Sequence, residues 1–460
     1  MDHYTRFSAR ASLVAVGQYM RQQGIWQTVE THVQIPQKVR VYEPLTKLKV
    51  ALLDILTGGH GLVEVNTRVR PDEALLRTFD IRAAAAPAAI RCPDQSVVST
   101  TVNACTKETV ATMHQALQAL QRQQSRSYRH DYAAQVQVLD VDITGLLAGL
   151  QAEEATKGYF AGKKGRRGRQ VGRVLATRYD EIVVDRLYPG KRQLERSLQD
   201  LVRAAEMVLG LSPEQRARTV IRFDGGGGRD ADINWLLDHG YPFLGKVKNW
   251  QRAHKLAATV SRWQQDPHGD REFGWVETPH PYHQPTRQLA VRAPTDDGGW
   301  HEWVLVFQLA DAQLFELGRQ PVRTTPTPDQ VAWAALAAYD LRGGGVETAN
   351  KGSKSGLGLD HRSKQKFAAQ EMLVALAQLA YNLLTWMRAV LAHRTPYLQH
   401  YGPLRLVRDV LQIPGKVVFD AYGHVVQIIL SQAHIHALAV RRALAPYLAR
   451  DGTALILDKI

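Results

Sequence analysis

The sequence predicts a mixed α/β or α+β protein built in several parts, and three observations support this. Residues 1 to about 130 show helical patterning with little β-branched alternation. From residue 133 apolar residues alternate along the chain, which indicates strands, and strand and helix signals then follow one another. Beyond residue 365 helical patterning dominates again. A chain of 460 residues is long enough for about three domains, each with its own core.

Composition places the chain among globular proteins with a basic surface. It is 45% hydrophobic and 22% charged, close to the average for folded domains. Its 58 Lys and Arg against 44 Asp and Glu give a net charge of +14, which favours a polyanionic partner, nucleic acid above all. The two cysteines, Cys92 and Cys105, exclude a disulfide framework and a four-cysteine zinc site, and they fit a reducing compartment.

Neither export nor a membrane span is expected. The N-terminal residues lack the charged-then-apolar layout of a signal peptide. The most apolar run, residues 372–390, carries Gln378, Asn382 and Arg388, so it predicts a buried amphipathic helix. We therefore expect a cytoplasmic protein with no membrane partner.

A helix, a tight turn and a second helix are predicted over residues 94–124. Asp94 can cap the first helix and Thr106 the second, and each helix has its apolar residues on one face. This outline fits a helix-turn-helix, which binds DNA, and it fits a plain helical hairpin equally well.

The central region predicts a sheet with helices around it. In "VLDVDIT" residues of opposite parity lie on opposite faces, as in a strand. Short stretches after Lys248, separated by Pro, Asp and Gly, predict an inserted antiparallel sheet over about 250–325. Further strands are expected at 172–180, 181–190, 218–224 and 242–248, with helices over 192–211 and 231–241.

Acidic side chains stand where two of these strands end. "VLDVDIT" carries Asp140 and Asp142, and "VIRFDGGGG" carries Asp224 before four glycines. Open α/β sheets bind ligands at strand ends, and glycines leave room for a close ligand. A loop that needs only flexibility is the alternative for the glycines.

A glutamate from a later segment would complete a set of oxygen ligands. The segment "YDLRGGGVETANKGSK", residues 339–354, contains Glu347 among cations and one aromatic ring. Two aspartates and a glutamate favour Mg²⁺ or Mn²⁺ and disfavour zinc. Two such ions can activate a water or hydroxyl for phosphodiester displacement. Taken alone, the segment also fits a solvated helix start.

In their order and spacing these motifs resemble the DDE transposases of bacterial insertion sequences. The closer resemblance is to the branch with a β-sheet insertion before the glutamate and a Tyr, Arg, Glu, Lys signature. It covers most of the chain, through "DQSVVSTTVNAC", "LDVDIT", "IRFDGGGG", "YDLRGGGVETANKGSK" and "AQEMLVALAQLAYNLLTWMR".

The resemblance implies an RNase-H-like mixed sheet flanked by helices, with an inserted antiparallel β subdomain, a helical N-terminal domain and a helical C-terminal region. The implied divisions are 1–130 for the DNA-binding domain, 131–249 and 326–392 for the two parts of the catalytic core, 250–325 for the insertion and 393–460 for the C-terminal region. That last region would supply a dimer contact or pack onto its own core.

The resemblance also implies the catalytic residues. Asp142, Asp224 and Glu347 would be catalytic and would bind two Mg²⁺ or Mn²⁺ ions. The family pattern places a Thr or Ser two positions after the first aspartate, and Thr144 favours Asp142, although Asp140 stays an alternative.

The spacing before the glutamate departs from the family pattern. The family has three residues between the Arg and the Glu, whereas four residues, 343–346, separate Arg342 from Glu347 here. The register of Glu347 is therefore open, and the glycines could absorb the extra residue.

DNA contacts are implied by the signature and by a basic run. In the family the Tyr, Arg and Lys hold phosphates near the cleaved end, which gives Tyr339, Arg342 and Lys354. The run "AGKKGRRGRQVGR" predicts a phosphate-contacting loop, with a solvated basic turn as the alternative. Its candidates are Lys163, Lys164, Arg166, Arg167 and Arg169.

The function implied is that of a DNA transposase. It would bind terminal inverted repeats in double-stranded DNA, cleave the ends by two-metal hydrolysis and join 3′-hydroxyl ends to target DNA, as a homodimer in a bacterial cytoplasm. Two alternatives remain, a DNA-binding regulator without catalysis and a structure-specific nuclease, and a strand-joining assay separates the transposase from the nuclease.

Overall fold

The computed structural model describes residues 3–84, 86–160, 165–321 and 324–460, which form two compact units. Unit 1 comprises Met1–Ser125, Leu147–Ala155 and Asn350–Ile460, and unit 2 comprises Arg126–Leu146 and Thr156–Ala349. The five-part division expected from the sequence stays a prediction.

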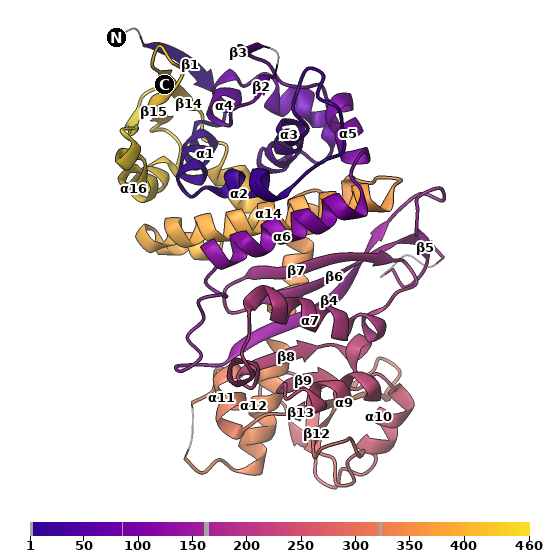
Figure 1. The fold of residues 1–460 in the computed structure, drawn as a ribbon. Helices are drawn as coiled ribbons and strands as arrows, with labels where there is room; N and C mark the ends of the chain where they lie inside the picture. The colour runs from indigo at the N-terminus through magenta and orange to yellow at the C-terminus, as the bar shows by residue number, and fades with distance from the viewer. Residues whose placement is uncertain (1–2, 85, 161–164, 322–323) are drawn as a thin grey trace. The chain divides into compact units, whose positions relative to one another are not determined.

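Unit 2 is built on a ten-stranded mixed sheet (Figure 1). The strand order is β10-β11-β12-β13-β9-β8-β4-β6-β5, with β7 paired to β6. Parallel pairing joins β4 to β8 and β8 to β9, and antiparallel pairing continues from β9 through β13, β12 and β11 to β10. The strands are β4 (Gln137–Leu147), β5 (Thr156–Lys157), β6 (Arg167–Ala176), β7 (Glu181–Pro189), β8 (Thr219–Phe223), β9 (Phe243–Lys246), β10 (Gln264–Gln265), β11 (Glu272–Trp275), β12 (Arg287–Pro294) and β13 (Trp300–Gln308).

Helices cover both faces of this sheet. Successive strand residues such as Val138 and Leu139 belong to different apolar clusters, as the alternation of a strand requires. One cluster includes α7 (Leu198–Leu209), α9 (Asp230–Asp238) and α10 (Trp250–Ala257), and the other includes α11 (Asp311–Leu317) and α12 (Pro328–Asp340). The mixed sheet flanked by helices confirms the predicted fold class, and the inserted strands extend the main sheet through β13 and β9. Short helices are η3 (Leu194–Arg196), α8 (Pro213–Arg216), η4 (Gly225–Gly227), η5 (Gly343–Glu347) and α13 (Thr348–Lys351).

Unit 1 is mainly helical. Its helices are α1 (Ala11–Gln22), α2 (Ile25–His32), α3 (Pro44–Leu56), η1 (Leu62–Glu64), η2 (Val65–Val69), α4 (Glu73–Thr78), α5 (Gln95–Asn103), α6 (Lys107–Gln124), η6 (Gly352–Gly356), η7 (Leu359–His361), α14 (Phe367–Arg394), η8 (Pro396–His400), α15 (Pro403–Arg405), η9 (Leu406–Val410), α16 (Ala437–Leu448) and η10 (Ala449–Asp451). Its strands are β1 (Tyr4–Ser8), β2 (Arg82–Ala83), β3 (Ala86–Ile90), β14 (Gly415–Phe419), β15 (Val425–Ser431) and β16 (Ala454–Asp458).

The predicted helical pair is present as α5 and α6. The Asp94 carboxylate accepts from the Ser96 amide, and the Thr106 hydroxyl accepts from the Thr109 amide, so both predicted caps are confirmed. The buried face of α6 packs on α2 and on α14, which lies beside it in Figure 1. The choice between a helix-turn-helix and a plain hairpin stays open.

The C-terminal region is not wholly helical, which corrects the prediction. The stretch 425–449 divides into strand β15 and helix α16, and β1, β14, β15 and β16 form a four-stranded sheet. The sequence "VVQIILS" is rich in β-branched residues and finds strand partners on both sides, so tertiary pairing outweighs the helical pattern.

Helix α14 is long and apolar enough to cross a membrane by length and composition alone, but 78% of its most apolar window is buried inside the protein. Its packing on α3 and α6 accounts for that apolar character and matches the buried helix predicted from sequence.

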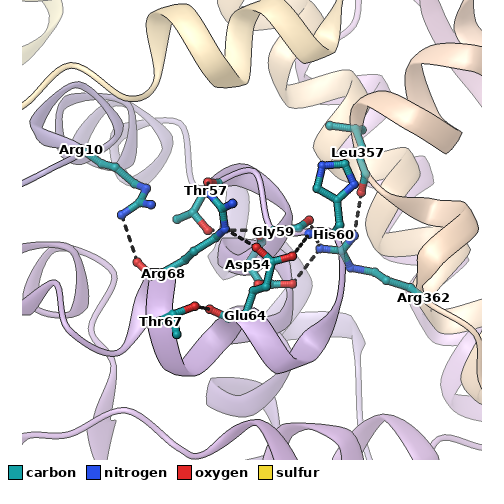
Figure 2. A network of polar contacts seen from close by, with 10 residues as sticks. All are labelled: Arg10, Asp54, Thr57, Gly59, His60, Glu64, Thr67, Arg68, Leu357 and Arg362. Atoms are coloured by element: carbon teal, nitrogen blue, oxygen red, sulfur yellow. Dashed lines mark hydrogen bonds and ion pairs between the residues drawn. The ribbon is translucent and has the colours of Figure 1, made fainter.

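A buried polar network attaches the segment after η6 to helix α3 (Figure 2). Arg362 donates to the Asp54 carboxylate at 2.7 Å, and both side chains are at most 1% exposed. Arg362 also donates to the carbonyls of Leu357 and Gly59. Burial raises the pKa of Asp54 to about 6, against the lowering effect of Arg362. Figure 2 also shows Arg10, Thr57, His60, Glu64, Thr67 and Arg68 around this pair.

Candidate active site

The two candidate aspartates follow the last paired residues of two adjacent parallel strands. The pairing of β4 with β8 ends at Val141 opposite Phe223. Asp142 follows Val141 and Asp224 follows Phe223, so the register brings the backbones of the two aspartates side by side. Strand β8 ends here, at the kind of position where open α/β sheets place their ligands, whereas β4 continues to Leu147, so the prediction that a strand ends at Asp142 is wrong.

Asp140 is fully buried and belongs to the structure of unit 2. Its carboxylate makes two bonds with Arg222, at 2.5 and 2.9 Å, and accepts a third from the Thr177 hydroxyl. Arg222 also donates to the carbonyl of Ala338 in α12. Asp140 therefore links β4, β8, α12 and the turn after β6, and its oxygens are already bonded. This arrangement favours Asp142 over Asp140 as the site residue.

Asp142 is less deeply buried and has an arginine partner in the site. Its side chain is 14% exposed, and Arg342 Nη2 donates to Asp142 Oδ1 at 2.9 Å. Burial raises the pKa of Asp142 to about 6, and the neighbouring Asp224 adds to this effect while Arg342 opposes it. The register of β4 and β8 thus places Asp224 near enough for its charge to act on Asp142.

Asp224 caps the glycine turn that follows β8. Its Oδ1 accepts from the Gly226 amide at 2.9 Å, which fixes the carboxylate at the entrance of η4. A Cβ at Gly228 would lie 1.9 Å from the carbonyl oxygen of Lys246, so that position needs glycine. The glycines thus let the turn pack closely on β9, beyond giving flexibility.

A π-turn absorbs the extra residue before the glutamate. Residues Gly343–Glu347 form η5, a π-helical turn, in which hydrogen bonds join residues five apart. Arg342 and Glu347 are five apart, and Arg342 Nη1 donates to Glu347 Oε1 at 3.2 Å. The additional residue therefore leaves Glu347 beside Arg342, while the assignment of Glu347 as the catalytic glutamate stays a prediction.

Arg342 bridges two of the three predicted ligands. It is 4% exposed, and it contacts both Asp142 and Glu347. Burial lowers its pKa, but Asp142, Asp224 and Asp140 outweigh that effect, and the net shift is upward. The sequence-based prediction placed Arg342 on a DNA phosphate, whereas here its guanidinium neutralises the acidic cluster.

Two further side chains lie at this cluster. Burial raises the pKa of the half-buried Tyr339, with Asp224 and Glu347 adding to the shift and Arg342 opposing it. Lys246 follows the pairing of Phe223 with Gly245, so it stands opposite Asp224 in register. Burial lowers the pKa of Lys246, and Asp224 opposes this. Sequence reasoning missed Lys246, although extending the register of the predicted strands would have found it.

Comparison with known proteins decides the family. The family model described as "Transposase DDE domain group 1" matches residues 5–450. The chain belongs to this family. No curated protein matches it. Among solved structures, it is similar to a cryo-EM structure of a piggyBac transposase synaptic complex with hairpin DNA, at 10% sequence identity and a TM-score of 0.43, covering 89% of this chain and 82% of that one.

The predicted resemblance to DDE transposases is thereby confirmed at the level of the family. The chain is a DNA transposase by descent, and its origin in a bacterial insertion sequence stays a prediction. The assignment of its catalytic, metal-binding site to the acidic residues on and after β4 and β8 stays a prediction.

The other predicted DNA contacts of the transposase are placed unevenly. Arg166 and Arg167 are exposed before and at the start of β6, as a phosphate-contacting stretch requires. Arg169 is 1% exposed, which contradicts its predicted role on the surface, because a residue inside β6 is covered by the neighbouring structure. Lys354 lies in η6 of unit 1, and its role stays a prediction. Lys163 and Lys164 lie outside the described residues.

The acidic cluster offers the oxygen donors that Mg²⁺ and Mn²⁺ prefer. Within the described ranges, however, no three His, Cys, Asp or Glu side chains are gathered closely enough to hold a metal ion. Glu347 is 61% exposed and bonded to Arg342. The donor set therefore fits a hard divalent cation, while the present geometry is that of acids neutralised by an arginine.

Proposed function

We propose that this chain is an active DNA transposase that uses Asp142, Asp224 and Glu347 to cut DNA at the ends of its element and to join the freed 3′ ends to target DNA. The observation that carries the proposal is the register of β4 and β8, which sets Asp142 and Asp224 side by side, with Glu347 tied to Asp142 through Arg342. Membership of the DDE transposase family supports it.

The three acids would hold Mg²⁺ or Mn²⁺, two ions per site. When bound, such ions activate a water or a 3′-hydroxyl and stabilise the leaving oxygen. Asp142 would supply a ligand from within β4, Asp224 one from the turn after β8, and Glu347 one from an exposed turn. Ligands held in this way would help to orient the reacting phosphate, and such positioning lowers the reaction barrier.

Arg342 has a second use in this proposal. Its planar guanidinium bonds carboxylates here, and a DNA phosphate offers the same kind of acceptor pair. If Arg342 released a carboxylate and bound a DNA phosphate instead, it would make the DNA contact predicted from sequence. Other contacts to the DNA strand would come from Tyr339, Lys246 and Lys354. The basic run of residues 161–173 would add Lys163, Lys164, Arg166 and Arg167.

The wider assembly follows from the chemistry of transposition. Two element ends must be held together, so we propose a homodimer on double-stranded DNA carrying terminal inverted repeats, in a bacterial cytoplasm. The net charge of +14 suits such a partner.

The test is cleavage of a labelled duplex that carries the terminal repeat taken from the DNA flanking the gene, with Mg²⁺ or Mn²⁺. Wild type should cut at the repeat boundary and join the 3′ end to a second duplex, and Glu347→Gln should do neither. Glu277→Gln, a change at an exposed glutamate elsewhere in unit 2, is the matched control and should cut as wild type does.

Three results would count against the proposal. Cutting without joining would indicate a structure-specific nuclease. Tight binding by wild type with no cutting would indicate a DNA-binding regulator. Cutting by Glu347→Gln at the wild-type rate would remove Glu347 from the site.

A further inference from the structure

Unit 1 contains a cationic concavity that the transposase chemistry above does not use. It has a volume of about 730 Å³ and is formed by the extended segment 36–42, by Arg70 after η2, and by residues 91–100 at the start of α5. Its lining carries five cationic side chains and one carboxylate, namely Lys38, Arg40, Lys47, Arg70, Arg91 and Asp94.

The single carboxylate does not neutralise these cations. Asp94 caps α5, and its oxygens already accept from the Ser96 amide and from the Asn66 side chain, each at 2.9 Å. The ion pair between Asp94 and Arg70 is long, at 3.6 Å, and solvent-exposed, so it contributes little. The concavity therefore keeps a clear excess of positive charge.

Three of the cations in the concavity face solvent. Lys38, Arg40 and Arg91 are exposed, and in the part of the chain that the structure describes none of them forms an ion pair with a carboxylate. They come from two separate segments, 36–42 and the residues ahead of α5. Two segments far apart in the sequence thus present uncompensated charge to one hollow.

Hydrogen bonds within unit 1 already hold the backbone that carries Lys38 and Arg40. The Gln37 side chain accepts from Lys47 in α3 and from Thr101 in α5, both at 2.7 Å. The Val41 carbonyl accepts from the Ala84 amide at 2.8 Å. These contacts fix the backbone on both sides of Lys38 and Arg40, so binding there would order few residues and cost little entropy.

We propose that this concavity binds the backbone phosphates of double-stranded DNA, as a second contact region of the transposase. The inference rests on the proposed function, because it takes the ligand to be DNA. Exposed cations on separate segments suit a row of phosphates. A free nucleotide fits less well, because Tyr42, the aromatic residue in the lining, is only 6% exposed and offers no open face for a base.

The test is equilibrium binding of a fluorescent duplex of about 30 base pairs in EDTA, so that cleavage plays no part. The variant combines Lys38→Ala, Arg40→Ala and Arg91→Ala. Its matched control combines Arg441→Ala, Arg442→Ala and Lys459→Ala, which removes the same charge from exposed positions of unit 1 outside the concavity. Thermal unfolding should be nearly unchanged in both, because all six side chains are exposed.

The cavity variant should bind DNA roughly tenfold or more weakly, and the slope of log Kd against log salt should fall by about 3, one for each phosphate that is no longer neutralised. The weakening should be equal for a terminal-repeat duplex and a scrambled one, since phosphate contacts carry no sequence information.

Equal weakening of the cavity variant and its control would overturn the inference, because net charge alone would then explain the effect. Unchanged binding of the cavity variant would also overturn it, while leaving the proposed function intact. A loss of affinity confined to the repeat duplex would assign the concavity to base readout and overturn the phosphate assignment. Failure of wild type to bind either duplex would instead refute the proposed function, and this inference with it.

Discussion

Two carboxylate–arginine pairs stand two residues apart on β4, and they differ in almost every physical respect. Asp140 is 0% exposed, bonds Arg222 through both oxygens and accepts from Thr177 as well. Asp142 is 14% exposed at the side chain and accepts from Arg342, which it shares with Glu347. We call Asp140–Arg222 the closed pair, because it is buried and its carboxylate oxygens are all bonded. We call Asp142–Arg342 the open pair, because Asp142 is partly exposed and shares its arginine with Glu347.

The difference follows from position along the strand. Asp140 lies within the paired part of β4, opposite Arg222 in the register, so its partner is fixed by the sheet. Asp142 lies one residue beyond the last pair, where β8 turns away through its glycines. The Asp140 carboxylate is satisfied by partners within the sheet, whereas Asp142 lies beyond the pairing with β8, although β4 itself continues to Leu147.

The largest effect that this comparison predicts is on activity. Asp142→Asn should lower end cleavage by on the order of a thousandfold or more, because it removes a charged ligand from the proposed metal site. The measurement is single-turnover cleavage of the end duplex with Mg²⁺. Asp270→Asn, at an exposed turn of unit 2, should cleave normally.

The same variant should be at least as stable as wild type near neutral pH. Burial raises the pKa of Asp142 to about 6 in the folded chain, above its ordinary value of 3.8. A raised acid pKa adds stability below about pH 4 that is lost as the pH rises through 6. The Asn variant should therefore gain on wild type in unfolding free energy between about pH 4 and pH 7. A cleavage rate within tenfold of wild type would contradict the assignment of Asp142.

The second prediction is that a change at the Asp140–Arg222 pair affects stability first. Asp140→Asn should lower the free energy of unfolding by about 3 kcal/mol, because it leaves the buried Arg222 guanidinium without its counter-charge. Denaturant unfolding measures this. Arg222→Met should relieve part of the loss when it is added to Asp140→Asn, since it removes the unpaired charge. Loss of cleavage at full stability would instead make Asp140 the metal ligand.

Sequence reasoning could locate the strands and the acids because both depend on local pattern. Alternation identified β4 and β8, and the glycines marked the turn after Asp224. Capping chemistry placed the starts of α5 and α6 correctly, because a cap is satisfied within a few residues of itself.

The rest depended on contacts between distant residues. The alternation of a strand puts Asp140 and Asp142 on one face. Only two facts distinguish their roles, the pairing of Asp140 with Arg222 and the end of the β4–β8 pairing before Asp142. The burial of Arg169 and the strand β15 likewise follow from neighbours that pattern does not reveal. The effect of an extra residue before Glu347 needed the π-turn itself, since an α-helical count would have moved the carboxylate out of place.

The third prediction concerns the open pair and has a moderate size. Arg342→Gln should strengthen Mn²⁺ binding roughly tenfold, because the arginine competes with a cation for Asp142 and Glu347. Calorimetric titration without DNA measures the affinity directly. Asp142→Asn is the comparison and should lose binding. An Arg342→Gln protein that loses Mn²⁺ affinity as far as Asp142→Asn does would show that the arginine supports the metal site.

The smallest predicted effects separate two adjacent glycines of the π-turn. A Cβ at Gly344 meets no atom within 4 Å, so Gly344→Ala should raise the free energy of unfolding by about 0.5–1 kcal/mol through better helix propensity. A Cβ at Gly345 would lie 2.8 Å from Asp140 Oδ2 and 2.7 Å from Thr177 Cγ2. Gly345→Ala should therefore cost about 1–3 kcal/mol. Thermal and denaturant unfolding of the two variants side by side measures both. The backbone at Gly345 packs against Asp140, two residues before Glu347. An equal change in unfolding free energy for both variants would mean that Asp140 does not hold the turn that carries Glu347.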